Sequence, residues 1–196
     1  KGGTGKSTIT ANLAVQAVRD NLAVLVIDAD TQQSLVDFRS IRAEKDLPQF
    51  QAVSITKNTI HKDAKNFKGF DLILIDAGGR DTTAFRSAIM AADWLFIPVL
   101  PSQYDIWAAQ NTIKILEEAR AFKTIHAGFV LNQVISNTRI SQEALEALHF
   151  PESIEQIGAK FIQCLYEGEL TESCVTQAKT VTEAMVNCIG EDKSCI

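Results

Sequence analysis

Four short apolar runs are spaced along the chain, and each ends at or just before polar or turn-forming residues. The runs are Ala23–Asp28, Phe70–Asp76, Trp94–Val99 and Ala127–Asn132. Unbroken apolar runs rich in β-branched residues are typical of strands that are buried on both faces of a parallel sheet. The pattern therefore predicts four buried strands that run parallel to one another.

The segments between these runs carry apolar residues at spacings of three and four, which is the period of one helix face. These segments are Ser7–Asp20, Ser34–Glu44, Thr82–Ala92 and Ile106–Ala121. Strands that alternate with helices predict an α/β fold, with a doubly wound, mostly parallel sheet flanked by helices. Because the sequence has no internal repeat and no linker rich in Pro, Gly or Ser, we expect a single domain over residues 1–196.

Polar residues at the carboxyl ends of the predicted strands form one candidate site. In open α/β sheets, ligands bind in the crevice beyond these strand ends. The residues concerned are Asp28, Asp30, Asp76, Pro101, Ser102 and Asn132.

Composition narrows the class of protein. With 46% apolar and 22% charged residues, the chain resembles an ordinary globular domain. No apolar run reaches the roughly 18 residues of a membrane-spanning helix, because Asp93 interrupts the longest candidate. The N-terminus does not resemble a signal peptide, so we expect a cytoplasmic protein. The four cysteines lack the paired spacing of a metal site and are expected to be free thiols.

Charge is unevenly distributed along the chain. The net charge of −5 argues against a protein whose whole surface contacts nucleic acid. Residues 1–142 contain 16 basic and 14 acidic side chains, whereas residues 143–196 contain 3 basic and 10 acidic ones. We therefore expect any patch that contacts DNA to lie outside the acidic C-terminal part.

The chain opens with a glycine-rich segment that has the features of a phosphate-binding loop. Its residues are Lys1, Gly2, Gly3, Thr4, Gly5, Lys6, Ser7 and Thr8. Glycines allow consecutive backbone N–H groups to approach phosphate oxygens, and a helix that starts near Lys6 directs its positive end at the same anion. In this pattern the lysine reaches the β- and γ-phosphates and the Ser7 hydroxyl ligates Mg²⁺. The alternative is a glycine-rich turn followed by an ordinary helix cap.

A phosphate loop of this kind normally follows a buried strand, but the sequence begins inside the loop. We expect that first strand to lie upstream of residue 1.

The octapeptide Lys1–Thr8 resembles the deviant Walker A box of the ParA/MinD superfamily, whose mark is the additional lysine at the position of Lys1. The resemblance implies ATP and Mg²⁺ as cofactors and an ATP-dependent homodimer. It also implies that Lys1 reaches across the dimer interface to the partner's ATP, where it adds positive charge during phosphoryl transfer. Lys1, Lys6 and Asp30 are then the expected catalytic residues.

Two further segments resemble motifs of the same superfamily. Asp28–Gln33 is similar to switch I, with Thr31 in place of the usual proline, and implies that Asp30 positions the attacking water near Mg²⁺ with support from Asp28. The alternative is that this Asp-x-Asp pair caps the next helix. Phe70–Asp76 with the following glycines resembles a Walker B strand and switch II, which implies that Asp76 holds Mg²⁺ through water.

The segment Ala91–Ala109 closely resembles its counterpart in small plasmid ParA proteins that lack an N-terminal DNA-binding domain. On this resemblance Pro101 lines the base and sugar of the nucleotide. Asn132 falls where relatives contact adenine, whose N6 and N7 edge an amide can pair with. A turn residue at the start of a loop is the alternative for Asn132.

The resemblance fades after about Ile140. Relatives carry a basic, DNA-binding segment near the position of residues 161–167, but this sequence has no arginine there. Nonspecific DNA binding is thus a weaker expectation than nucleotide binding. The final predicted helix, residues 181–189, contains Glu183 and no basic residue, unlike the membrane-binding tail of MinD-type proteins.

The resemblance therefore implies a nucleoid-associated DNA-partition ATPase of the ParA type, with slow intrinsic hydrolysis that a ParB-like centromere-binding partner stimulates. Three other functions use the same fold. One is a MinD-like positioning ATPase, and another is an ATP-dependent biosynthetic ligase, for which no basic acid-binding cluster is evident near the loop. The third, electron transfer of the nitrogenase-reductase type, needs cysteines near switch II and after the next strand, and neither region has one.

Overall fold

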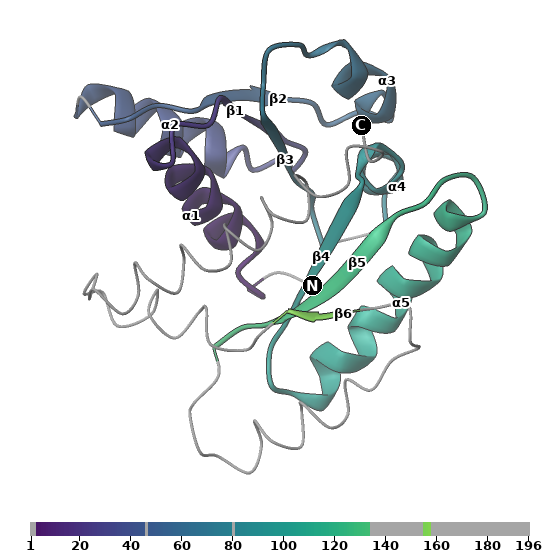
Figure 1. Cartoon of the computed structure of the whole chain (residues 1–196). Helices are drawn as coiled ribbons and strands as arrows, with labels where there is room; N and C mark the ends of the chain where they lie inside the picture. Colours follow the sequence, from purple (N-terminus) through teal and green to yellow (C-terminus); the bar gives the residue numbers. More distant parts are fainter. Residues whose placement is uncertain (1–2, 46, 80, 134–154, 158–196) are drawn as a thin grey trace. The chain divides into compact units, whose positions relative to one another are not determined.

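Two three-stranded parallel sheets organise the chain. The structure, a computed structural model, describes residues 3–45, 47–79, 81–133 and 155–157. The chain divides into two units, residues 1–92 and 93–196 (Figure 1). The first contains the sheet β2-β1-β3 and the second contains the sheet β4-β5-β6. The expectation of a single domain stays a prediction.

The first unit alternates helices with strands, as the apolar pattern predicts. Its elements are α1 (Lys6–Arg19), β1 (Val24–Asp28), α2 (Ser34–Glu44), β2 (Gln51–Ser54), α3 (Ile60–Asp63), the 3-10 helix η1 (Ala64–Asn66), β3 (Leu72–Asp76) and α4 (Thr83–Ala91). Strand β1 is central and pairs in parallel with β2 and β3. The register places Asp28 opposite Asp76, so two carboxylates end adjacent strands.

Helices cover both faces of this first sheet. Val24 and Val26 of β1 pack with Ala14 and Ala17 of α1 in one core cluster. The alternate residues of the strand, such as Ile27, belong to a second cluster with residues of α3 and α4. Side chains of a strand alternate between its faces, so a run that is apolar at every position needs a cover on each side. The doubly wound arrangement is thus confirmed in the first unit.

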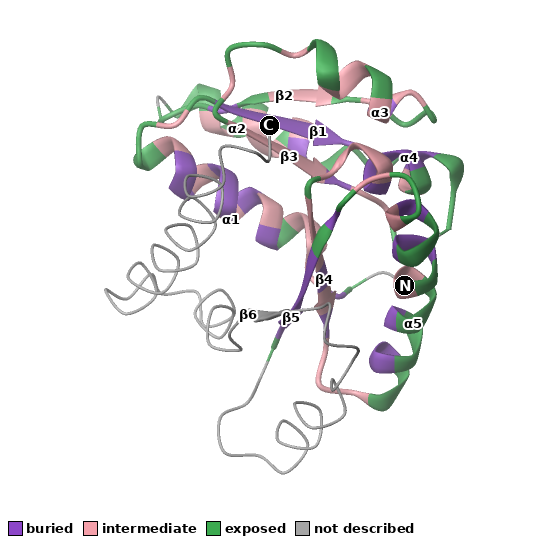
Figure 2. Cartoon of the chain, turned by 45° about the vertical axis from the view of Figure 1, so that its right-hand side comes forward, coloured by how far each residue is buried: buried purple, intermediate pink, exposed green. Residues whose placement is uncertain are grey.

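Burial differs between the paired strands β1 and β3. Every residue of β1 is buried, whereas β3 is half-buried along its length except at Asp76 (Figure 2). The central strand has a neighbour on each side, while β3 pairs with β1 alone among the strands that the structure describes.

The second unit contains β4 (Trp94–Val99), α5 (Gln103–Arg120), β5 (His126–Leu131) and β6 (Glu155–Ile157). Strands β4 and β5 pair in parallel over their whole length. One face of this sheet packs on α5, where Ile97 and Phe129 meet Ile106 and Ala109. The opposite side of α5 is exposed (Figure 2), as expected for an amphipathic surface helix.

All four predicted strands are confirmed, and so are the four helices predicted within residues 7–121. The prediction for α5 was wrong at its start, because the helix begins at Gln103 rather than Ile106. Ser102 caps it there, and its Oγ accepts the N–H of Asp105 at 3.2 Å. Sequence reasoning missed β2, α3 and β6, which have only three or four residues each. Runs this short give no readable period.

Several sequence expectations fall outside the described residues. They concern the four cysteines, segment 161–167 and the helix predicted at 181–189. None of the helices that the structure describes has the length and apolarity needed to cross a bilayer.

Candidate nucleotide-binding site

The phosphate loop leads directly into α1. Gly3 and Gly5 have φ values of 91° and 86°, in the left-handed region that favours glycine. Gly5 is the residue before the helix, and it has no side chain with which to cap the N–H groups of the first turn. That turn also has no acidic residue, so its positive end is not neutralised from within the helix. Lys1 and Gly2 lie outside the described residues.

The start of α1 meets the end of β3 through Ser7 and Asp76. Burial raises the pKa of Asp76 to about 6, the Ser7 hydroxyl that donates to this carboxylate lowers the pKa, and the charge of Asp28 raises it. Lys6 exerts a smaller lowering effect and Asp30 a smaller raising one. Five side chains from three segments of the chain thus share one electrostatic environment. The structure brings these five side chains together at the strand ends, and their roles toward a ligand stay a prediction.

The oxygen donors at this position fit a magnesium ion that is held partly by its substrate. Ser7, Asp30 and Asp76 offer one hydroxyl and two carboxylates. Within the described ranges, no group of three or more His, Cys, Asp or Glu side chains is arranged to hold a metal ion by itself. Mg²⁺ commonly binds one or two carboxylates and completes its octahedron with water and phosphate oxygens. A buried carboxylate whose pKa is raised by neighbouring carboxylates is the environment that such a cation stabilises.

Asp28 holds the loop between β1 and α2. It is completely buried, its Oδ1 accepts the N–H of Asp30 at 3.2 Å and its Oδ2 accepts the N–H of Leu35 at 2.9 Å. Leu35 lies in the first turn of α2. The helix-capping alternative therefore holds for Asp28, which also fixes the backbone from which the Asp30 side chain projects.

Asp30 lies beside the loop that follows β3. Its Oδ1 accepts the N–H of Gln32 at 3.1 Å, which closes a local turn. A Cβ atom placed on Gly78 would lie 3.4 Å from Oδ2 of Asp30. Sequence reasoning did not detect this approach, because two adjacent glycines after a strand indicate only a loop.

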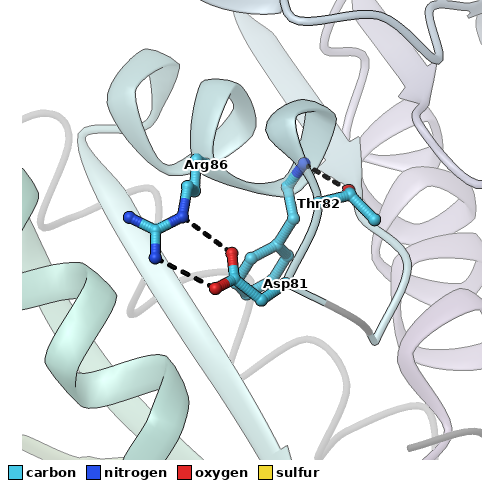
Figure 3. A network of polar contacts seen from close by, with 4 residues as sticks. Asp81, Thr82 and Arg86 are labelled. Carbon is cyan, nitrogen blue, oxygen red and sulfur yellow. Dashed lines mark hydrogen bonds and ion pairs between the residues drawn. The ribbon is translucent and has the colours of Figure 1, made fainter.

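The far end of that loop is fixed at the start of α4 (Figure 3). Arg86 donates two hydrogen bonds to Asp81, from Nε to Oδ1 at 2.7 Å and from Nη2 to Oδ2 at 2.9 Å. This pairing lowers the pKa of Asp81. Thr82 caps α4 by accepting the N–H of Phe85 at 3.1 Å. The loop therefore runs between a buried strand end and a capped helix start.

In the second unit, the strand ends bring Pro101 and Asn132 to one edge of the sheet. Val99 pairs with Leu131 at the ends of β4 and β5, and the N–H of Asn132 donates to the carbonyl of Val99 at 2.7 Å. Asn132 is buried, and its Oδ1 accepts the N–H of Gln133 at 2.7 Å. The turn alternative therefore describes part of what Asn132 does, while its contact with adenine stays a prediction.

Comparison with known proteins identifies the family. Residues 1–174 match the CobQ/CobB/MinD/ParA nucleotide binding domain. The chain belongs to this family. Among curated relatives, the maintenance of carboxysome distribution protein A of Halothiobacillus neapolitanus is 33% identical over 164 residues, which are 77% of this chain and 72% of that protein.

Solved structures of low sequence identity share the fold. A plasmid partition protein from Borrelia burgdorferi bound to AMPPNP aligns with a TM-score of 0.70 and 16% identity over 96% of this chain and 95% of its own. Cobyrinic acid a,c-diamide synthase from Mycobacterium smegmatis, with a bound ATP analogue and magnesium, aligns with a TM-score of 0.77 and 12% identity. This alignment covers 98% of this chain and 93% of the synthase chain. The α/β class with a mostly parallel sheet and flanking helices is thereby confirmed.

Proposed function

We propose that this member of the CobQ/CobB/MinD/ParA family is a ParA-type partition ATPase that binds Mg-ATP and dimerises on it. The observation that carries the proposal is the link between Ser7 at the start of α1 and the buried Asp76 at the end of β3, with Lys6 and Asp30 in the same electrostatic environment. This set of groups matches a triphosphate with its cation better than it matches a neutral substrate.

Nucleotide binding relies on the backbone of the loop and on three side chains. The amides of Gly2, Gly3, Thr4 and Gly5 surround the phosphates together with the start of the helix, where Thr8 also lies. Lys6 neutralises the β- and γ-phosphate oxygens, and Ser7 and Asp76 hold the magnesium ion with Asp30 next to it. When bound, Mg²⁺ neutralises charge on the β- and γ-phosphates. In the second unit, Pro101 and Asn132 are the proposed contacts of the base and sugar.

Hydrolysis requires a water that is held in line with the γ-phosphate. Asp30 accepts a hydrogen bond from this water and thereby orients its oxygen toward phosphorus. The bond from the water oxygen to the γ-phosphorus forms as the bond from this phosphorus to the β–γ bridging oxygen breaks. The products are ADP and inorganic phosphate. One proton of the water stays on the phosphate and the other passes to solvent. Lys1 of the other subunit adds positive charge to the phosphoryl group. The step is slow until a partner protein completes the site.

The relatives favour a role in positioning or partition over biosynthesis. The identity of 33% to a protein named for carboxysome distribution exceeds the 12% to the diamide synthase, and the latter value reflects the shared fold alone. We propose that the dimer acts in the cytoplasm on nucleoid DNA, with a ParB-like centromere-binding partner. A cargo other than a plasmid is the second candidate, and the carboxysome relative is the observation that favours it.

Sedimentation in ATP and in ADP tests the proposal. Wild type should dimerise in ATP and remain monomeric in ADP, while Lys1→Ala should bind the nucleotide and stay monomeric. Lys57→Ala, which removes an exposed lysine of the same unit, is the matched control and should dimerise. Monomeric wild type at saturating ATP analogue would contradict the ParA-type function, and normal dimers of Lys1→Ala would contradict only the role of that lysine. Turnover with a panel of carboxylic acids would instead favour the ligase.

A further inference from the structure

Gly78, in the loop after β3, lies close to the carboxylate of Asp30. A Cβ atom on Gly78 would have two neighbours within 4 Å, and both belong to the Asp30 carboxylate: Oδ2 at 3.4 Å and Cγ at 3.7 Å. Among the described residues, a side chain at this position would therefore meet at its base the carboxylate that is assigned to the attacking water.

The backbone at position 78 does not itself require glycine. Gly3, Gly5 and Gly69 have positive φ, where other residues are strained, but Gly78 does not. An alanine could adopt its backbone conformation without strain. The absence of a side chain at Gly78 therefore leaves space next to Asp30 and is not required by the backbone conformation.

The two oxygens of the Asp30 carboxylate differ in their surroundings. Oδ1 is engaged by the N–H of Gln32, and the main chain of Asp30 is fixed through its N–H by Asp28. Oδ2 accepts no hydrogen bond from the part of the chain that the structure describes, and it is the oxygen that faces Gly78. A carboxylate oxygen with free lone pairs is an acceptor for water, so Oδ2 is the oxygen available for the nucleophile.

We propose that Gly78 is a positioning residue of ATP hydrolysis, because its missing side chain keeps the space beside Oδ2 of Asp30 open to the attacking water. This inference rests on the proposed ATPase function and adds a residue to it. A methyl group at position 78 would contact Oδ2 directly and occupy part of the volume that hydrates it. The groups assigned to the phosphates lie on the loop before α1 and in the first turn of that helix, so we expect a methyl group at position 78 to leave nucleotide binding intact.

The experiment compares Gly78→Ala and Gly78→Val with wild type in the full chain. We expect kcat to fall about 10-fold in Gly78→Ala and further in Gly78→Val, since a displaced nucleophile reacts much more slowly. KM for ATP and the affinity for an ATP analogue should stay within about two-fold, because a group that acts only in the transition state changes kcat and leaves binding unchanged. The melting temperature should be unaffected in Gly78→Ala.

Gly69→Ala is the matched control, because Gly69 has a φ of +80° and an added Cβ there would have no atom of the described residues within 4 Å. That variant should lower the melting temperature through backbone strain and leave kcat unchanged. Wild-type kcat in Gly78→Ala, with an active parent protein, would overturn the inference alone. A parent protein that binds ATP without hydrolysing it would overturn the ATPase function and this inference together. A loss of nucleotide affinity that matches the loss of kcat would also overturn the inference about Gly78, since this residue would then contribute to nucleotide binding.

Discussion

The carboxyl ends of β1 and β3 occupy the same place in their sheet as the ends of β4 and β5 do in theirs, but the polar side chains there are used differently. In the second unit, Ser102 and Asp105 exchange hydrogen bonds at the start of α5, and Asn132 binds the N–H of the next residue. In the first unit, Ser7 reaches from a helix to Asp76 on a strand. The contacts in the second unit shape local structure, whereas the contact in the first unit joins separate elements.

The difference shows where the first unit departs from what folding alone requires. Burial raises the pKa of Asp76, and the nearby carboxylates of Asp28 and Asp30 raise it further, which disfavours the charged state of the folded site. A capping arrangement like that of Ser102 would satisfy a helix start without crowding like charges. Crowded carboxylates beside Lys6 are therefore best explained by a ligand that carries both a cation and an anion, as Mg-ATP does.

Removing the water-positioning carboxylate should give the largest effect. Asp30→Ala is expected to lower kcat for ATP about 1,000-fold with nucleotide affinity retained, since a positioned acid or base contributes roughly that much. The same change in the second unit, Asp105→Ala in the first turn of α5, should leave kcat near wild type and lower the melting temperature. Hydrolysis assays and thermal unfolding on both variants test this. An equal loss of kcat in Asp30→Ala and Asp105→Ala would contradict the assignment of catalysis to the first unit.

The carboxylate of Asp28 should instead matter for folding. Asp28→Ala leaves the N–H groups of Asp30 and Leu35 without their acceptor, and the expected loss is about 3 kcal/mol of unfolding free energy, because bonds to a buried charge are among the stronger ones. Denaturant unfolding measures it, and Asp30→Ala, which loses one exposed local bond, is the control. Unchanged stability in Asp28→Ala would show that the loop between β1 and α2 is held by other contacts.

Much of this comparison could be predicted from sequence, because strand ends and motifs are local features. The runs that end at Asp28 and Asp76 predicted the two strands, and the observed pairing of β1 with β3 makes the two carboxylates neighbours. The structure also places Ser7 beside Asp76, and the assignment of the two residues to one functional site stays a prediction.

Contacts between loops could not be predicted from the sequence. Nothing in the residue order indicates that Gly78 approaches Asp30, since that contact is set by how two loops leave adjacent strands. The short strand β2 was missed because half of its residues are exposed and its apolar period is too brief to read. The cap at Ser102 was readable in principle, because a Ser followed three residues later by Asp at a helix start is a capping pattern.

The local character of the contacts in the second unit can be tested at that cap. Ser102→Ala removes the acceptor of the Asp105 N–H and should cost about 1 kcal/mol of unfolding free energy, the usual loss for an N-cap. Thr82→Ala, which removes the cap of α4 in the first unit, is the matched variant and should cost a similar amount. Denaturant unfolding compares them. A much larger loss at Ser102 would mean that this residue joins separate elements, contrary to the comparison.

The exposed ion pairs should give the smallest effects in both units. Arg86 binds both oxygens of Asp81, whereas Lys123 binds one oxygen of Asp93 at 2.8 Å. All four side chains are substantially exposed, so water and salt screen the attraction. Neither Arg86→Ala nor Lys123→Ala should shift the melting temperature clearly at neutral pH and physiological salt.

Any contribution from Arg86 should have a defined pH dependence. Because the pairing lowers the folded-state pKa of Asp81 below its ordinary value of 3.8, the stabilisation is present above that value and is lost as pH falls through the folded pKa. The difference in stability between wild type and Arg86→Ala should therefore shrink in acid and in high salt. Unfolding at several pH values and salt concentrations measures it. A difference that persisted in acid would show that Arg86 acts through packing at the end of the Gly78 loop rather than through its charge.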